Sequence, residues 1–170
     1  MKAFLRDTLI TLVIAAIIVL GMRIVIQSSI VVSPSMEPSL QVGQRIIINK
    51  IAYTFGQPQR GDIVVFHPPG NQTDDYVKRI IGLPNESVEI TDGIVYIHKE
   101  DGSVLSLNEP YVTDPPRNHF KGNVIPEDEF FVMGDHRNNS SDSRGGWTLP
   151  RQNIVGKAWL TIWPPEEWGL

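Results

Sequence analysis

One long apolar run dominates the start of the chain. Residues 8–26 read TLITLVIAAIIVLGMRIVI, with a single charge at Arg23 near the end of the run. At a rise of about 1.5 Å per residue, a helix of this length extends roughly 28 Å, close to the hydrocarbon thickness of a bilayer. The pattern predicts a transmembrane anchor over residues 8–27, with Arg23 near enough to one edge for its guanidinium to reach water.

The charges before this run predict how the helix is oriented. Lys2, Arg6 and the terminal amine precede it, and basic residues favour the cytoplasmic side of a membrane. We therefore expect residues 1–7 to form a cytoplasmic tail and residues 28–170 an extracytoplasmic domain. A cleaved signal peptide would share the basic start and the apolar run. The residues from Arg23 to Gln27 offer no small-x-small cleavage pattern, which favours a retained single-pass anchor.

Beyond residue 40 the apolar positions follow the period of β-strands. Short runs rich in β-branched residues alternate with turns rich in Pro, Gly and Asn, and no convincing amphipathic helix appears. The dipeptides Asp92-Gly93 and Asp101-Gly102 each predict a hairpin. The fold class is therefore mostly β, an antiparallel β-sheet domain behind one transmembrane helix. The predicted strands are RIIINK, DIVVFH, YVKRII, SVEIT, IVYIHK, EFFVMG and IVGKAWLTIW.

Composition narrows the class of protein further. With 170 residues, of which 41% are hydrophobic, the chain can form one domain with a core in addition to the anchor. The net charge of −4 and the scattered Lys and Arg residues argue against a nucleic-acid partner. Because cysteine is absent from the sequence, disulfides and thiolate metal sites are excluded.

Three polar stretches interrupt the apolar pattern, and each could carry chemistry. The first is SPSMEP, residues 33–38, in which two prolines restrict the backbone around Ser33 and Ser35. A restricted backbone suits a nucleophilic hydroxyl that must be held at attack distance. Taken alone, an ordinary turn next to the membrane explains the stretch better.

The second stretch is DDYVKRIIGLP, residues 74–84, in which Lys78 shares a strand face with Tyr76 and Ile80. Apolar neighbours and the adjacent cation Arg79 would both lower the pKa of the Lys78 amine, which increases the neutral, basic fraction at pH 7. A lysine that reaches solvent from an edge strand is the alternative, and this stretch by itself favours that alternative.

The third stretch is MGDHRNNSSDSR, residues 133–144, directly after an apolar strand. Its two aspartates, two arginines and three serines could satisfy one another in a network of charge-assisted hydrogen bonds. A solvated surface loop has the same composition, so the third stretch alone does not decide between the two.

Taken together, the three stretches resemble a known family. In this order after one apolar run, SPSMEPSL, YVKRIIGLP and MGDHRNNSSDSR resemble the boxes of bacterial type I signal peptidases, and the resemblance extends to about Trp163. It implies a membrane-bound serine endopeptidase of the signal peptidase/LexA-like β fold, which removes signal peptides from exported preproteins. It implies acyl-enzyme chemistry with no cofactor and no metal.

The resemblance also assigns roles to individual residues. Ser35 is similar to the nucleophile of the family and Lys78 to its general base, while the Ser35 N–H and the Ser33 hydroxyl match the oxyanion hole. Ser140 matches the serine that orients the lysine amine. The resemblance implies supporting ion pairs for Arg79, Asp135, Asp142 and Arg144, and small substrate pockets built by Val31, Met36, Leu40 and Tyr76.

Two positions depart from the pattern of the family. His136 stands where the family usually has Asn, and Trp147 stands where it usually has Gly, with glycines at 145 and 146 instead. These departures affect the local turn and leave the proposed catalytic positions intact.

The resemblance and the anchor together predict the surroundings of the protein. We expect a monomer in the cell membrane that contacts the lipid bilayer and takes exported preproteins with small residues before the cleaved bond. Three tryptophans near the C-terminus could anchor the domain at the interface or belong to its core, namely Trp159, Trp163 and Trp168.

Three alternatives compete with this interpretation. Asp135 and His136 beside a serine-rich loop could belong to a Ser/His/Asp triad, although a lysine at position 78 favours the dyad. A soluble self-cleaving repressor of the same Ser/Lys clan is disfavoured by the apolar run. A membrane-tethered β module that binds envelope partners without catalysis is the third, and cleavage of a preprotein separates it from an enzyme.

Overall fold

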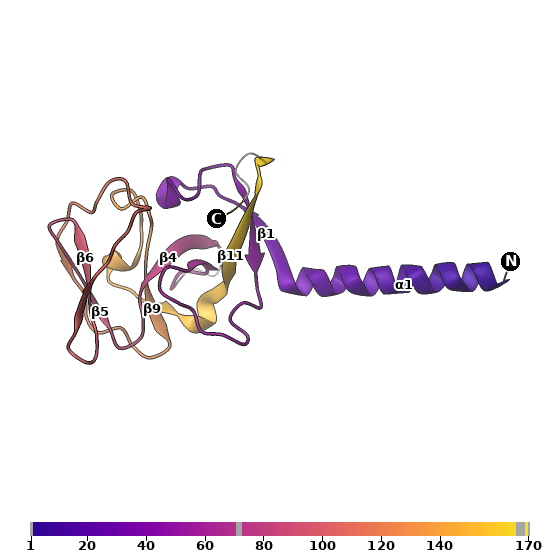
Figure 1. Ribbon diagram of the computed structural model, residues 1–170, viewed down its shortest axis with the longest axis horizontal. Coiled ribbons are helices and arrows are strands. Elements are labelled where there is room, and N and C mark those ends of the chain that lie inside the picture. The colour runs from indigo at the N-terminus through magenta and orange to yellow at the C-terminus, as the bar shows by residue number, and fades with distance from the viewer. Residues whose placement is uncertain (1, 71–72, 166–168, 170) are drawn as a thin grey trace.

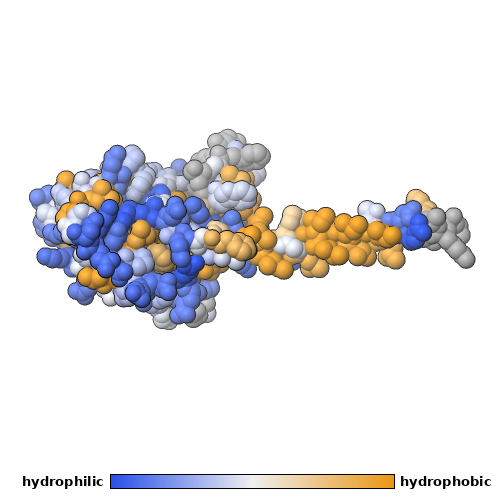
Figure 2. Space-filling view, turned by 60° about the horizontal axis from the view of Figure 1, so that its bottom comes forward, coloured by the Kyte–Doolittle hydropathy of each residue, from blue (hydrophilic) through white to orange (hydrophobic). Residues whose placement is uncertain are grey.

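The computed structural model describes residues 2–70, 73–165 and 169. One helix, α1 (Lys2–Val25), extends away from a β-rich body (Figure 1). Within Arg6–Val25, a window of 18 residues has a mean hydropathy of 2.5, and none of this window is buried against the rest of the protein. Figure 2 shows the apolar surface of this helix beside a mostly polar body. By length and composition α1 can cross a membrane, as the apolar run predicts.

The helix passes into the sheet without a connecting loop. It ends at Val25, and strand β1 (Ile26–Ile30) begins at the next residue, so the last two residues of the predicted anchor belong to the sheet. The Lys50 backbone N–H donates to the Val25 carbonyl at 2.9 Å and ties the last turn of α1 to the residue after β2 (Arg45–Asn49). Each residue of β1 then pairs with β2.

A seven-stranded sheet forms the centre of the body. Its order is β1-β2-β11-β3-β4-β9-β10, and each pairing between its described strands is antiparallel. The predicted antiparallel class is therefore confirmed. Besides β1 and β2, the strands are β3 (Ile63–Phe66), β4 (Tyr76–Gly82), β9 (Glu129–Met133), β10 (Leu149–Pro150) and β11 (Ile154–Trp163).

A smaller four-stranded sheet lies on the side of the body away from α1 (Figure 1). Asp92 and Gly93 join two of its strands with φ values of 52° and 79°, which are the positive angles of a tight hairpin turn. Both predicted hairpins, at Asp92-Gly93 and Asp101-Gly102, are confirmed by the pairings. The strands are β5 (Ser87–Thr91), β6 (Ile94–His98), β7 (Val104–Ser106) and β8 (Phe120–Lys121).

The sheet is covered on both faces at its centre. In β3 the side chains of Ile63 and Val65 join one core cluster, while Val64 and Phe66 join another on the opposite face. A strand buried on both faces reads as a continuous apolar run, as IVVF does here. Segment 31–40 crosses one face, where it contributes three buried apolar side chains and the short 3₁₀ helix η1 (Pro34–Met36).

The two described C-terminal tryptophans are surface residues. Trp159 and Trp163 each expose 59% of their surface, so a place in the core is wrong for both. Trp168 lies outside the described residues.

Candidate active site

Helix η1 holds the first catalytic candidate. Pro34 opens this short helix, where its fixed φ suits the helical conformation, and the Glu37 N–H closes the turn onto the Pro34 carbonyl at 3.1 Å. Met36 is fully buried in the core and fixes the turn from below. Ser35 between them is 4% exposed. The prolines and the buried methionine together explain how a hydroxyl on an irregular segment is held in place.

Strand β4 brings the second candidate to the same point. Lys78 lies 43 residues along the chain from Ser35, and its Nζ is 2.7 Å from Ser35 Oγ. The same amine donates to the Val77 carbonyl at 3.0 Å, and the Tyr76 ring centroid lies 5.4 Å away. Lys78 is 4% exposed. The two residues that the sequence singles out as nucleophile and base are therefore in hydrogen-bond contact.

Burial increases the neutral fraction of the Lys78 amine near neutral pH, and only the neutral form can act as a base. Desolvation lowers the pKa of Lys78 from 10.5 to about 8, while the charges of Asp142 and Asp135 act in the opposite direction. Repulsion by Arg79 is not a cause, which corrects the sequence-based argument, because Arg79 is paired with Asp135. A substantial fraction of the amine is therefore neutral near pH 8 and can accept the Ser35 proton.

Ser35 and Lys78 line a cleft of about 790 Å³. Ser33 also lines the cleft, is exposed, and makes no capping bond to η1 through its side chain. Two of the residues expected to form substrate pockets, Val31 and Tyr76, line the cleft as well. The other two, Met36 and Leu40, are fully buried in the core, where they support the wall without lining it.

Asp135 fixes the strand that carries Lys78. Arg79 donates to both carboxylate oxygens of Asp135, at 2.9 and 2.6 Å, and its guanidinium stacks 3.9 Å from the Tyr111 ring centroid. A third bond links the same guanidinium to Ser39 Oγ at 3.2 Å. Because Asp135 is 1% exposed, this bidentate ion pair is shielded from water, and with the bond to Ser39 it ties β4, segment 31–40 and the 133–144 loop together.

Asp142 holds the other end of this loop. Arg144 donates to both of its oxygens at 2.8 Å, and the Gly134 N–H adds a bond of 3.1 Å. Burial alone would raise the pKa of Asp142, but the bonds and charge of Arg144 lower it below its ordinary value. Ser140 lies beside it and helps to lower that pKa, yet its Oγ makes no well-formed hydrogen bond, to Lys78 or otherwise, among the described residues.

Sequence reasoning missed one buried ion pair. Arg137 is 1% exposed, and its guanidinium donates to both oxygens of Glu109, at 2.5 and 2.7 Å. Tyr111 completes the group through its hydroxyl, which donates to Glu109 at 2.8 Å. The composition of the loop 133–144 suggests that its charges pair with one another. Two of them pair instead with residues elsewhere in the chain, Asp135 with Arg79 and Arg137 with Glu109.

A His-based triad does not fit this arrangement. Asp135 is committed to Arg79, and the His136 ring contacts the Pro34 carbonyl at 3.2 Å. The hydroxyl of Ser35 instead has Lys78 as its partner.

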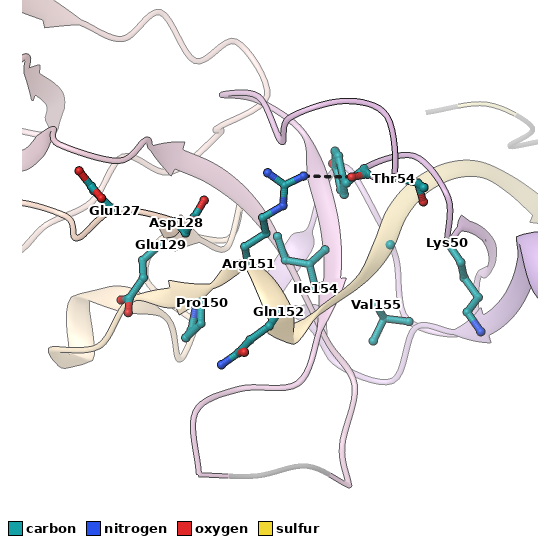
Figure 3. Close-up of a pocket in the computed structure, with 12 residues that line it drawn as sticks. Lys50, Thr54, Glu127, Asp128, Glu129, Pro150, Arg151, Gln152, Ile154 and Val155 are labelled. Carbon is teal, nitrogen blue, oxygen red and sulfur yellow. Dashed lines mark hydrogen bonds between the residues drawn. The ribbon is translucent and has the colours of Figure 1, made fainter.

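A second hollow, of about 600 Å³, shares no lining residue with the cleft. Figure 3 shows Arg151 in it, between the acidic turn at 127–129 and the segment after β2. Arg151 donates to the carbonyls of Tyr53 and Gly56 at 3.0 and 3.1 Å, so its guanidinium stabilises the turn that contains these two residues. Arg151 thus has a structural role in this hollow, whereas the Ser35–Lys78 pair lies in the cleft.

A buried serine hydroxyl beside a buried lysine amine, on a β domain that follows one apolar helix, is consistent with a serine hydrolase anchored in a membrane. Residues 5–163 match the family model described as signal peptidase, peptidase S26. The chain therefore belongs to the signal peptidase family and is a serine peptidase.

Relatives of this family cover nearly the whole chain. A probable signal peptidase I-1 of Synechocystis is 38% identical, over 98% of this chain and 86% of its own length. A signal peptidase IB of Staphylococcus aureus is 35% identical over 98% of this chain and 94% of its own. The crystal structure of a signal peptidase I from Enterococcus faecalis superposes with a TM-score of 0.52 at 31% identity, covering 59% of this chain and 96% of that one.

Proposed function

We propose that the protein removes signal peptides from exported preproteins, with Ser35 as nucleophile and Lys78 as general base. The observation that carries the proposal is the 2.7 Å contact between Ser35 Oγ and Lys78 Nζ on the wall of an open cleft. Family membership supports the peptidase activity, and the names of the relatives support a signal-peptide substrate.

The reaction proceeds in two halves. Neutral Lys78 takes the hydroxyl proton as Ser35 Oγ attacks the carbonyl carbon of the peptide bond, and then donates that proton to the leaving amine. In the second half Lys78 takes a proton from water, whose oxygen attacks the acyl carbon. Ser35 leaves with the proton and is regenerated. Each half returns Lys78 to its neutral state, which the lowered pKa of its amine favours.

Two donors stabilise the oxyanion that develops in each half. Ser33 and Ser35 both line the cleft, and we assign the oxyanion hole to the backbone N–H of Ser35 and the hydroxyl of Ser33. We assign substrate contact to Val31 and Tyr76 and a preference for small side chains before the cleaved bond, as the resemblance implies.

The anchor places this chemistry at the membrane. In the proposed orientation the N-terminus is cytoplasmic and the β domain is extracytoplasmic, as the basic residues before the apolar run favour. The protein acts as a monomer, and preproteins whose apolar segments lie in the bilayer present their cleavage sites to it in the same plane.

Cleavage of a preprotein by the detergent-solubilised full chain tests the proposal. The wild type should produce the mature product at a rate that rises with pH through about 8, because the neutral form of Lys78 is the base. Ser35→Ala and Lys78→Ala should each lose at least about a thousandfold in kcat. Full activity in either variant, or a pH limb near 10, would contradict the assigned dyad.

A further inference from the structure

Residue 136 contacts both peptide units that flank Ser35. Its backbone N–H donates to the Ser35 carbonyl at 3.1 Å, and its ring Nδ1 lies 3.2 Å from the Pro34 carbonyl oxygen. The first contact can be made by any residue with an N–H. The second requires a side chain with a donor at this position, so it depends on the identity of residue 136.

The partner of the ring determines which nitrogen carries the proton. A carbonyl oxygen accepts and cannot donate, so Nδ1 must carry hydrogen for the bond to form. Glu37 Oε2 lies 3.9 Å from the same nitrogen and favours a proton there. The side chains of His136 and Glu37 are 34% and 40% exposed, so the ring lies at the edge of the site and not inside it.

The Pro34 carbonyl belongs to the same peptide unit as the Ser35 N–H. Because a peptide unit is planar, fixing the direction of its C=O also fixes the direction of its N–H. A donor on the oxygen also polarises the unit and makes the N–H a better hydrogen-bond donor. The Glu37 N–H already occupies one lone pair of this oxygen, at 3.1 Å, and His136 takes the other.

We propose that His136 is a positioning residue that orients and polarises the Ser35 N–H for the oxyanion through the Pro34 carbonyl. The inference rests on the proposed function, because it needs that N–H in the oxyanion hole. His136 touches no reacting atom, and its effect is exerted through one peptide unit.

The bond from His136 Nδ1–H to the Pro34 carbonyl can form whether the ring is neutral or protonated, and the charged groups around the ring do not compete for the Pro34 oxygen. Glu37 faces it from the end of η1, and Asp114 faces it from the loop before β8, paired with Arg117 at 3.0 Å and Asn138 at 2.9 Å. Of its chain neighbours, Asp135 is paired with Arg79 and Arg137 with Glu109. Nδ1–H donates both in the neutral tautomer that carries hydrogen there and in the cation. A substitution at His136 should therefore change the maximal rate without changing the pH midpoint near 8, which is assigned to Lys78.

His136→Asn and His136→Leu provide a matched pair, since their side chains have nearly the same shape and the amide alone can donate at the position of Nδ1. In the detergent-solubilised full chain, His136→Leu should lower kcat about tenfold with KM unchanged, a fraction of the loss caused by deleting a direct oxyanion donor. His136→Asn should stay within about twofold of the wild type, because it restores the bond to Pro34.

A peptide aldehyde of the substrate sequence gives a second measurement. Ser35 Oγ adds to the aldehyde carbon as its proton passes to neutral Lys78, and the former carbonyl oxygen occupies the oxyanion site as the anion. Its affinity should fall about tenfold in His136→Leu and recover in His136→Asn. If His136→Leu shows no cooperative thermal unfolding, His136→Gln replaces it. The amide of Gln lies one bond farther from Cα than Nδ1 does, so it should not form the bond to Pro34, and the same losses are expected.

Equal activity of the Asn and Leu variants would overturn the inference, whether both match the wild type or both are impaired. A loss seen in KM alone, or a shifted pH limb, would overturn it as well. The proposed function fails separately, if the wild type does not cleave the preprotein or Ser35→Ala does.

Discussion

At the scale of single residues, the burial of Lys78 increases the neutral fraction of its amine but lowers the free energy of unfolding. The unfolded chain holds the proton of this amine with a pKa near 10.5, and the folded chain holds it with a pKa of about 8. Between these values the unfolded state binds more protons, so the free energy of unfolding rises with pH. Below pH 8 the full penalty applies, which is about 3 kcal/mol at about 1.4 kcal/mol per tenfold change in the protonation equilibrium.

Removing the amine should therefore stabilise the fold while it abolishes catalysis. We expect Lys78→Met to raise the free energy of unfolding by about 2 to 3 kcal/mol at pH 7, and the gain to shrink to under about 1 kcal/mol at pH 10. Urea denaturation at the two pH values measures both quantities. Lys99→Met, at an exposed position, is the control and should change stability by less than about 0.5 kcal/mol at either pH. A destabilised Lys78→Met at pH 7 would contradict this prediction.

The residue scale also shows where sequence reasoning stops. Ser35 and Lys78 could be singled out only because the three polar stretches, taken in order, resemble a known family. Taken alone, the surroundings of each residue favoured an ordinary turn or an edge-strand lysine. Arg137 could not, since its partner Glu109 lies 28 positions away in a loop whose path only the fold determines. The lowering of the Lys78 pKa was predicted from burial, but the neutralisation of Arg79 depends on Asp135, which is 56 positions away.

At the scale of elements, the contact between η1 and the end of β9 holds the site together. Gly134 follows β9, and a Cβ at this position would collide with the Ser35 carbonyl and with Ser140 Oγ. The absence of a side chain lets the two segments approach closely enough for the His136 N–H to reach the Ser35 carbonyl at 3.1 Å.

Gly134→Ala should therefore separate η1 from β9. We expect a loss of about 1 to 3 kcal/mol in stability, because a backbone carbonyl cannot move aside as a flexible side chain can. At least a tenfold loss in kcat should accompany it, because small displacements of a reacting group are costly. Gly145→Ala is the matched control, since its Cβ would find Trp147 at an ordinary 3.5 Å. Similar denaturation midpoints and kcat values for the two variants would refute the close-packing argument.

Strands were predicted correctly where the sequence shows a clear β pattern, and they were missed where the same residues also fit a helix or a loop. The apolar strands were predicted from short runs rich in β-branched residues between turns, and both hairpins from their turn residues. Strand β1 was missed because Ile26 and Gln27 continue an apolar helical run, and β8 because Phe120 and Lys121 lie in a Pro-rich loop. The order of strands in the sheet depends on contacts between distant segments, which a period along the chain does not contain.

At the scale of the whole molecule, the helix and the β domain are separable in structure. None of the Arg6–Val25 stretch is buried, whereas β1 pairs along its whole length with β2 and its end lines the cleft. The boundary between the helix and the β domain is therefore sharp, and it falls between residues 25 and 26.

Truncation at this boundary should separate chemistry from access to the membrane. A chain beginning at Val25 should cleave a soluble peptide in detergent within about threefold of the full-length rate, because no packing is lost. It should cleave a preprotein embedded in vesicles at least about tenfold more slowly, because confinement to one surface raises effective concentration. A chain beginning at Val31, which lacks β1, should lose activity on both substrates. Equal losses on both substrates in the first truncation would contradict this separation.

The direct passage from α1 into β1 has a geometric consequence. Because no loop separates Val25 from the sheet, and because the Lys50 N–H donates to the Val25 carbonyl, the β domain is attached directly to the end of α1. Under the proposed function, this attachment holds Ser35 at a fixed distance from the bilayer surface. The enzyme then selects a scissile bond by its distance from the apolar segment of the substrate, in addition to any preference for particular side chains.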